Sequence, residues 1–236
     1  MKSLATAILI LLSFGSYGQH LNDFFSKTDS FLNTHVKDGK VDYKTIHKDP
    51  SELDAILKNA EKISVDVSDA DNYQAFWINA YNLAVIKGII NNYPIKSPLD
   101  HQGFFDKTTY SLAGKNITLN AIENTLLRAQ FKDARFHFVL VCGALGCPPL
   151  INEAYLPSKL NTQLDTQTKL AINGDFLKVN TKKKRVEASE IMKWYNEDFT
   201  TNGMSEIDFI NTYRTEKIPT NYKLSYFSYN WSLNNQ

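Results

Sequence analysis

The chain has 236 residues, of which 43% are hydrophobic, 12% aromatic and 22% charged. This composition is typical of a globular protein and excludes a disordered, collagen-like or coiled-coil chain. Its 26 lysines and arginines are balanced by 25 aspartates and glutamates. Because nucleic acids and anionic membranes usually require a basic surface, neither is expected as a partner.

The first 18 residues have the pattern of a signal peptide. Lys2 precedes an apolar stretch, residues 4–14, which is too short to span a bilayer. Ser16 and Gly18 are the small residues expected before a cleavage site at Gln19. We therefore expect an exported mature chain, periplasmic or secreted, with no integral membrane segment. A short anchor that stays attached is the alternative interpretation.

The first half of the mature chain is predicted to be mainly helical. Apolar residues at helical spacing predict an amphipathic helix over residues 21–32 and a second helix from Pro50. The segment 68–91 is apolar almost all the way round, which predicts a buried central helix. Asn79 and Asn82 are its polar exceptions. Buried amides need partners, so these two residues either tie loops to the core or line a binding site.

Short strands and helices alternate in the second half. The pattern predicts hairpins over 110–119 and 176–187, a helix over 120–128 capped by Asn120, and a buried strand over 136–142. The remaining elements are a helix over 157–172, short helices over 190–199 and 205–214, and a strand over 224–229. No linker or repeat interrupts this order. We therefore expect one α+β domain over residues 19–236, with a buried central helix, a small mixed sheet and two hairpins.

Five segments in a fixed order carry a family resemblance. They are KDGKVDY at 37–43, AFWINAYN at 75–82, the run from His137 to Leu150, residues 193–199, and WSLN at 231–234. Together they resemble the domain of unknown function 547 family over about residues 22–234. The resemblance implies a single exported or cell-envelope domain and brings no agreed activity. The chain departs from the family at Asn124, where histidine is frequent, and at Asn230, where aspartate is frequent.

His137 and Cys147 are the residues best placed for chemistry. His137 lies in the predicted buried strand, where an imidazole needs a hydrogen-bond partner. Strand alternation would direct Cys142 to the opposite face. Cys147 escapes that alternation because the glycines at 143 and 146 let the chain turn back. Pro148 would place Cys147 near a helix N-terminus, which lowers the pKa of a thiol.

These residues suggest a nucleophilic thiol beside a general base. Cys147 would attack an acyl carbon, His137 would take up the thiol proton, and Glu123 would orient the imidazole. Glu123 is alternatively a capping-box residue of its helix. Asn79 and Asn82 would contact the substrate. The sequence thus predicts a thiol-dependent hydrolase or acyltransferase that uses no cofactor and acts on amide or ester bonds of an envelope or extracellular substrate.

Two other arrangements stay open. A disulfide between Cys142 and Cys147 is the default for a cysteine pair in an exported chain, and it would remove the nucleophile. The protein would then be a non-catalytic envelope protein that binds a partner through its aromatic-rich C-terminal segment. A zinc site formed by His137, both cysteines and Glu123 is the other arrangement. Strand alternation would scatter these ligands, so no metal is expected.

Overall fold

The computed structural model describes the backbone of residues 2–236 and the side chains of residues 19–236. The predicted signal peptide, residues 1–18, therefore lies outside the residues whose side chains are described. Within the described part of the chain, no helix combines the length and the apolar character needed to cross a membrane.

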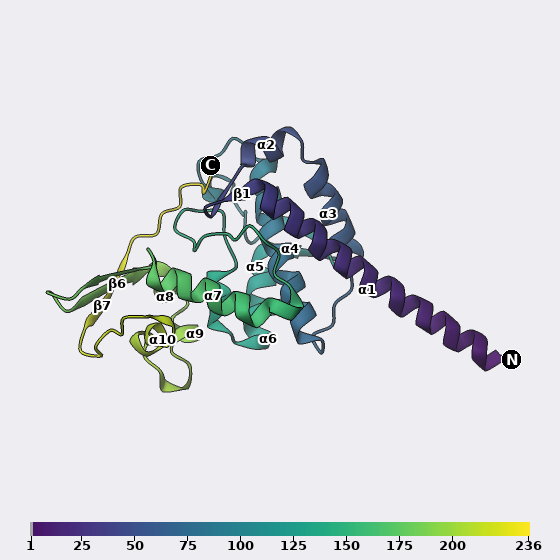
Figure 1. The fold of residues 1–236 in the computed structure, drawn as a ribbon. Coiled ribbons are helices and arrows are strands. Elements are labelled where there is room, and N and C mark those ends of the chain that lie inside the picture. The colour runs from purple at the N-terminus through teal and green to yellow at the C-terminus, as the bar shows by residue number, and fades with distance from the viewer. Residues whose placement is uncertain (1) are drawn as a thin grey trace.

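Helices of the N-terminal half surround the long helix α4 (Ala70–Asn91), as Figure 1 shows. They are α1 (Lys2–His35), α2 (Tyr43–Lys48) and α3 (Ser51–Lys62), with a small hairpin of β1 (Val36–Lys37) and β2 (Lys40–Val41) between α1 and α2. Nearly every residue of α4 from Tyr73 to Ile90 is buried. This confirms the central helix, whose apolar character on all sides is satisfied by packing on all sides.

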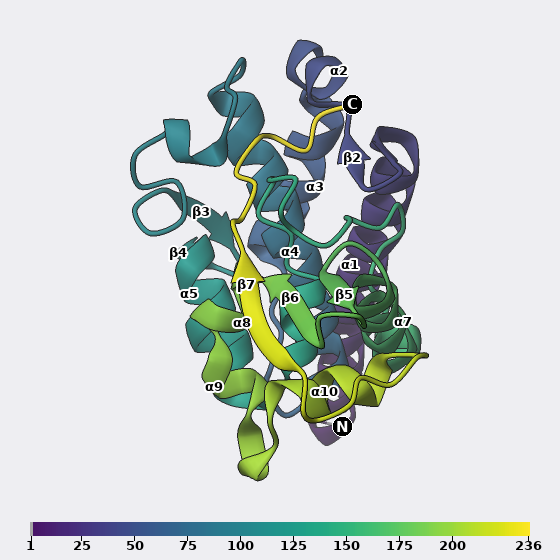
Figure 2. The same ribbon diagram turned by 90° about the vertical axis from the view of Figure 1, so that its left-hand side faces the viewer.

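The strands that follow α4 form two hairpins and a mixed sheet at the predicted places. β3 (Thr109–Leu112) pairs antiparallel with β4 (Lys115–Thr118). β5 (Leu177–Asn180) pairs antiparallel with β6 (Arg185–Ser189), and β6 pairs parallel with β7 (Lys223–Phe227). Figure 2 shows these last three strands side by side. The small mixed sheet and the α+β class are therefore confirmed.

The helix that follows the β3–β4 hairpin is wound unusually at its centre. α5 (Leu119–Ala121), η2 (Ile122–Arg128) and α6 (Ala129–Phe131) succeed one another without a break, and η2 is a π-helix. The cap is Thr118, whose hydroxyl oxygen accepts a hydrogen bond from the Ala121 amide at 3.1 Å. The predicted Asn120 cap is wrong by two residues. Single π-helical turns are frequent at functional sites.

The predicted strand over residues 136–142 is wrong. Residues 134–138 form the short 3₁₀-helix η3 (Ala134–Phe138), and no regular element continues to Cys142. The run is apolar because Phe136 and Phe138 enter two different hydrophobic clusters. An apolar run of this length does not by itself distinguish a buried strand from other buried segments.

Two hydrophobic clusters make up the core. The larger surrounds α4, and the smaller lies among the three-stranded sheet and four further helices. Those helices are α7 (Leu160–Asn173), α8 (Glu190–Trp194), α9 (Asn196–Phe199) and α10 (Glu206–Tyr213). In Figure 1 the strands β6 and β7 lie at the far left of the molecule, while α1 and α3 lie at the right.

The C-terminal segment returns from the smaller cluster to the larger one. It leaves β7 and ends beside the β1–β2 hairpin (Figure 2). Three backbone hydrogen bonds of 2.7, 2.8 and 3.0 Å join residues 230–234 to the loop 143–146, which separates the two cysteines. The side-chain oxygen of Asn234 accepts a further bond from the buried Tyr43 hydroxyl at 2.7 Å. The segment thereby anchors the cysteine loop.

Candidate functional site

A cavity of about 300 Å³ lies where the two hydrophobic clusters meet. Tyr81 of α4 and Glu123 of η2 line it from one side, and Ile191 and Trp194 of α8 line it from the other. Most of its wall is aromatic or aliphatic. A mostly apolar cavity with a few converging polar groups is the usual form of a binding or active site.

All three predicted catalytic residues line this cavity. Cys147, His137 and Glu123 come from a loop, from η3 and from η2 respectively. Cys142 lines it as well, so the prediction that Cys142 faces away from His137 is wrong. That prediction relied on strand alternation, and these residues do not form a strand.

Cys142 and Cys147 are joined by a disulfide, one of the arrangements that the sequence left open. Both cysteines are half-buried, and the cavity reaches both. The Cys142 amide donates a hydrogen bond to Cys147 Sγ at 3.0 Å. The Tyr229 hydroxyl oxygen lies 2.9 Å from each sulfur. The disulfide is therefore held by polar contacts at the wall of the cavity.

Tyr229 is a hydrogen-bond donor to the sulfurs. Burial raises the pKa of its hydroxyl, and nearby Tyr195 and Glu123 raise it further, so the group keeps its proton at neutral pH. Since neither sulfur of a disulfide carries a proton, the shared hydrogen belongs to Tyr229. Gly146 permits this approach, because a Cβ at that position would lie 2.8 Å from the Tyr229 ring.

His137 is held by Asp198 of α9. The imidazole Nε2 lies 2.6 Å from Asp198 Oδ2, and the ring packs against Tyr195 with centroids 4.2 Å apart. The expectation that Glu123 orients the imidazole is wrong, because the hydrogen-bond partner of His137 is Asp198. Sequence analysis missed this residue, which lies 61 positions from His137.

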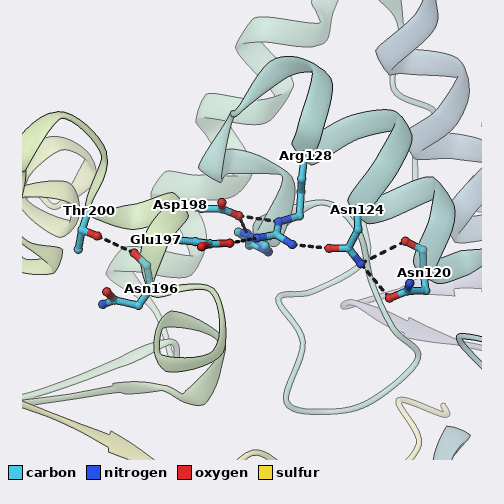
Figure 3. A network of polar contacts seen from close by, with 8 residues as sticks. Asn120, Asn124, Arg128, Asn196, Glu197, Asp198 and Thr200 are labelled. Atoms are coloured by element: carbon cyan, nitrogen blue, oxygen red, sulfur yellow. Dashed lines mark hydrogen bonds and ion pairs between the residues drawn. The ribbon is translucent and has the colours of Figure 1, made fainter.

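Arg128 completes the support of Asp198. Its Nε donates to Asp198 Oδ2 at 2.6 Å, and its other nitrogens bond Asn124 and Glu197 (Figure 3). Burial by itself would raise the pKa of Asp198, but the hydrogen bonds and charges of His137 and Arg128 outweigh it and lower the pKa to about 2. Asp198 is therefore ionised at neutral pH and can only accept hydrogen bonds.

The ionised Asp198 determines which nitrogen of His137 carries the proton. Nε2 must be the donor in the contact with Asp198, so in the neutral imidazole Nδ1 bears the free lone pair. Among the described residues, the hydrogen-bond partner of the His137 ring is Asp198, which engages Nε2 and leaves Nδ1 open. It is therefore available as an acceptor or a base.

Glu123 lies beside the hydroxyl groups of tyrosines that line the cavity. The Tyr81 hydroxyl lies 3.5 Å from Glu123 Oε2. Burial raises the pKa of Tyr81 and of Tyr195, and the charge of Glu123 raises both further. The capping-box alternative for Glu123 is wrong, because Thr118 caps this helix and starts it one residue before Asn120.

Asn79 and Asn82 do not line the cavity but tie loops to α4. The Asn79 side chain donates to the Tyr155 carbonyl at 2.7 Å and accepts from the Tyr155 amide at 3.0 Å. Asn82 likewise donates to the Val139 carbonyl and accepts from the Val141 amide, both at 2.9 Å. Of the two roles considered for these residues, the geometry matches the structural one.

The candidate zinc ligands His137, Cys142, Cys147 and Glu123 are not arranged as a metal site. Over the described residues, no three His, Cys, Asp or Glu side chains are grouped so that they could hold a metal ion. Both sulfurs are engaged in the disulfide, and His137 is engaged by Asp198.

The contacts of Asp198 predict a defined pH dependence of stability. Its pKa in the folded protein, about 2, lies below the ordinary value of 3.8. Its contribution to stability is therefore complete above about pH 4 and is lost as the pH falls towards 2. Asp198→Asn should lower the free energy of unfolding by about 1–2 kcal/mol at pH 7, and the difference should shrink below about pH 4.

Urea denaturation at a series of pH values measures this difference. Glu197→Gln is the matched control, since Glu197 is the mostly exposed partner of the same arginine and should change stability little. A deficit of Asp198→Asn that is equal at pH 7 and at low pH would contradict the assignment.

Comparison with known proteins gives one match. Residues 66–170 match the model of a family described as "Protein of unknown function, DUF547". The matched segment contains Glu123, His137 and both cysteines, while Asp198 and Tyr229 lie beyond it. No curated protein and no solved structure matches the chain. Over residues 66–170, the chain is therefore similar to the DUF547 family, whose function is unknown.

Proposed function

We propose that the protein is a thiol-dependent hydrolase or acyltransferase whose nucleophile is Cys147 in the reduced state. One observation carries the proposal: Cys147 and His137 line one cavity, and His137 is oriented by an ionised carboxylate. A thiol reductant would supply the two electrons and two protons that convert the disulfide into two thiols.

Polar contacts favour Cys147 over Cys142 as the nucleophile. The Cys142 amide donates to Cys147 Sγ and so distinguishes the two sulfurs, whereas the Tyr229 hydroxyl lies 2.9 Å from both. Hydrogen bonds to a charged group stabilise that charge. After reduction these two donors would stabilise a thiolate at Cys147 and lower its pKa.

The geometry supports a two-step acyl transfer. His137 Nδ1 would accept the thiol proton while Asp198 holds Nε2–H and stabilises the imidazolium. The Cys147 thiolate would attack the acyl carbon, and the imidazolium would return the proton to the leaving amine or alcohol. Water or a second nucleophile would then cleave the thioester and restore the thiol.

A non-catalytic binding role is the second candidate, and the disulfide favours it. With Cys142 and Cys147 joined, no free thiol lines the cavity. The aromatic wall would then serve to bind a ligand. The two candidates differ in whether reduction creates reactivity towards an acyl donor.

Acylation by a chromogenic ester distinguishes them. The reduced protein should release p-nitrophenol from p-nitrophenyl acetate in a burst and retain one acetyl group on Cys147, whereas the oxidised protein should not react. Cys142→Ser should react without added reductant, and Cys147→Ser should not react. His137→Ala should slow acylation by roughly 100-fold or more, the usual contribution of a general base.

Intact-mass spectrometry and peptide mapping locate the acetyl group, and a thermal melt of each variant checks its folding. Acetylation of Cys142 in place of Cys147 would contradict the assignment of the nucleophile. If the reduced protein, like the oxidised protein, releases no burst of p-nitrophenol and gains no acetyl group, the binding role is favoured.

We also propose that the chain acts outside the cytoplasm, in the periplasm or the extracellular medium, on an envelope or extracellular substrate. The pattern of residues 1–18 supports this, as does the disulfide, which is typical of oxidising compartments. The mature protein isolated from the envelope or medium should begin at Gln19. A cytosolic protein that retains residues 1–18 would contradict the proposal.

A further inference from the structure

We infer that the cavity binds a substituted ammonium group, held by the Glu123 carboxylate and the aromatic rings around it. The inference rests on the proposed function in one respect. If the protein acts on amides or esters, its substrate is one that carries a cationic group. The binding step itself needs no free thiol.

Aromatic rings form one contiguous wall of the cavity. Trp194, Tyr229 and Trp231 pack against one another with centroid distances of 4.7, 5.1 and 6.1 Å, and Phe105 adjoins Trp231 at 6.3 Å. Tyr195 lines the same cavity. Aromatic faces carry partial negative charge, and rings grouped in this way attract quaternary and substituted ammonium ions. Trp194 is nearly half exposed, so a ligand can reach this wall from solvent.

Glu123 supplies a carboxylate to the cavity, and within residues 19–236 no lysine or arginine is in ion-pair contact with it. Its polar partners are tyrosines: the Tyr81 hydroxyl lies 3.5 Å from Oε2, and Tyr195 is a further hydrogen-bond partner. Arg128 lies on the same helix but bonds Asp198 and Glu197. A carboxylate that faces an apolar cavity is costly unless it is paired. A ligand cation would provide that pair.

The charges at the cavity also disfavour an anionic ligand. No lysine or arginine is among its lining residues. Glu190, which accepts a hydrogen bond from the Tyr229 amide at 2.9 Å, is a second carboxylate in contact with a lining residue. His137 is committed through Nε2 to Asp198. A carboxylate or phosphate would therefore meet repulsion from Glu123. Arg128 covers one face of Tyr195, with its guanidinium carbon 4.6 Å from the ring centroid, so an ammonium group would bind at the Trp194, Tyr229 and Trp231 rings.

Two isosteric probes isolate the contribution of charge. Choline carries a quaternary ammonium, and 3,3-dimethylbutan-1-ol has the same shape without the charge. We expect choline to bind the oxidised protein roughly tenfold more tightly than the neutral alcohol, measured by tryptophan fluorescence and confirmed by calorimetry. Glu123→Gln should remove most of this preference, and Trp194→Leu should weaken choline binding. Glu197→Gln is the control and should change neither affinity.

Equal affinity for the two probes, an unchanged preference in Glu123→Gln, or a lack of saturable choline binding would each overturn the inference. Circular dichroism of each variant shows whether its fold is retained. Because the oxidised protein has no free thiol, this result is independent of acyl transfer. Acylation by a neutral ester together with no choline preference would leave the proposed function standing and reject the ammonium site.

Discussion

The contact of Asp198 with Arg128 and His137 is the interaction on which the site depends. Asp198 belongs to α9 in the smaller hydrophobic cluster, whereas Arg128 lies on η2 against the larger one. His137 lies between Phe136 and Phe138, which enter opposite clusters. One carboxylate therefore joins both parts of the core and fixes the imidazole at their junction. Its ionisation is maintained by the two groups that it positions.

The cysteine loop depends on a different constraint. Backbone bonds from residues 230–234 hold it, and two glycines let it pack closely. Gly143 has a positive φ of 81°, and a Cβ there would lie 2.5 Å from the Ile89 side chain. Gly146 leaves room for the Tyr229 ring. The last segment of the chain thus shapes a site whose sulfur atoms come from its middle.

Sequence patterns predicted the elements whose formation depends on neighbouring residues in the chain. Helix α4 was predictable because its apolar character extends over six turns, and the hairpins were predictable from strand patterns separated by turns. The run 136–142 was not, because continuous apolar character does not distinguish a strand from a segment that enters two clusters. Once that strand was assumed, the orientation of Cys142 followed wrongly from it.

The convergence of Cys147, His137 and Glu123 on one cavity was predicted from residue chemistry alone. Asp198 and Tyr229 were missed as members of the site because they lie 61 and 87 residues from their partners His137 and Cys142. Asn79 and Asn82 have the burial expected of site residues, but their amide groups are used entirely by backbone partners. Sequence patterns identify which groups need partners, and only the tertiary fold identifies the partners.

Reactivity of the two thiols in the reduced protein tests the central claim most directly. The measurement is site-resolved labelling with substoichiometric iodoacetamide over a range of pH, read by peptide mass spectrometry. The account predicts that Cys147 is alkylated faster than Cys142, and that it remains reactive below the pH at which free cysteine loses its reactivity. A Cys147 that reacts no faster than free cysteine, or more slowly than Cys142, would contradict the account.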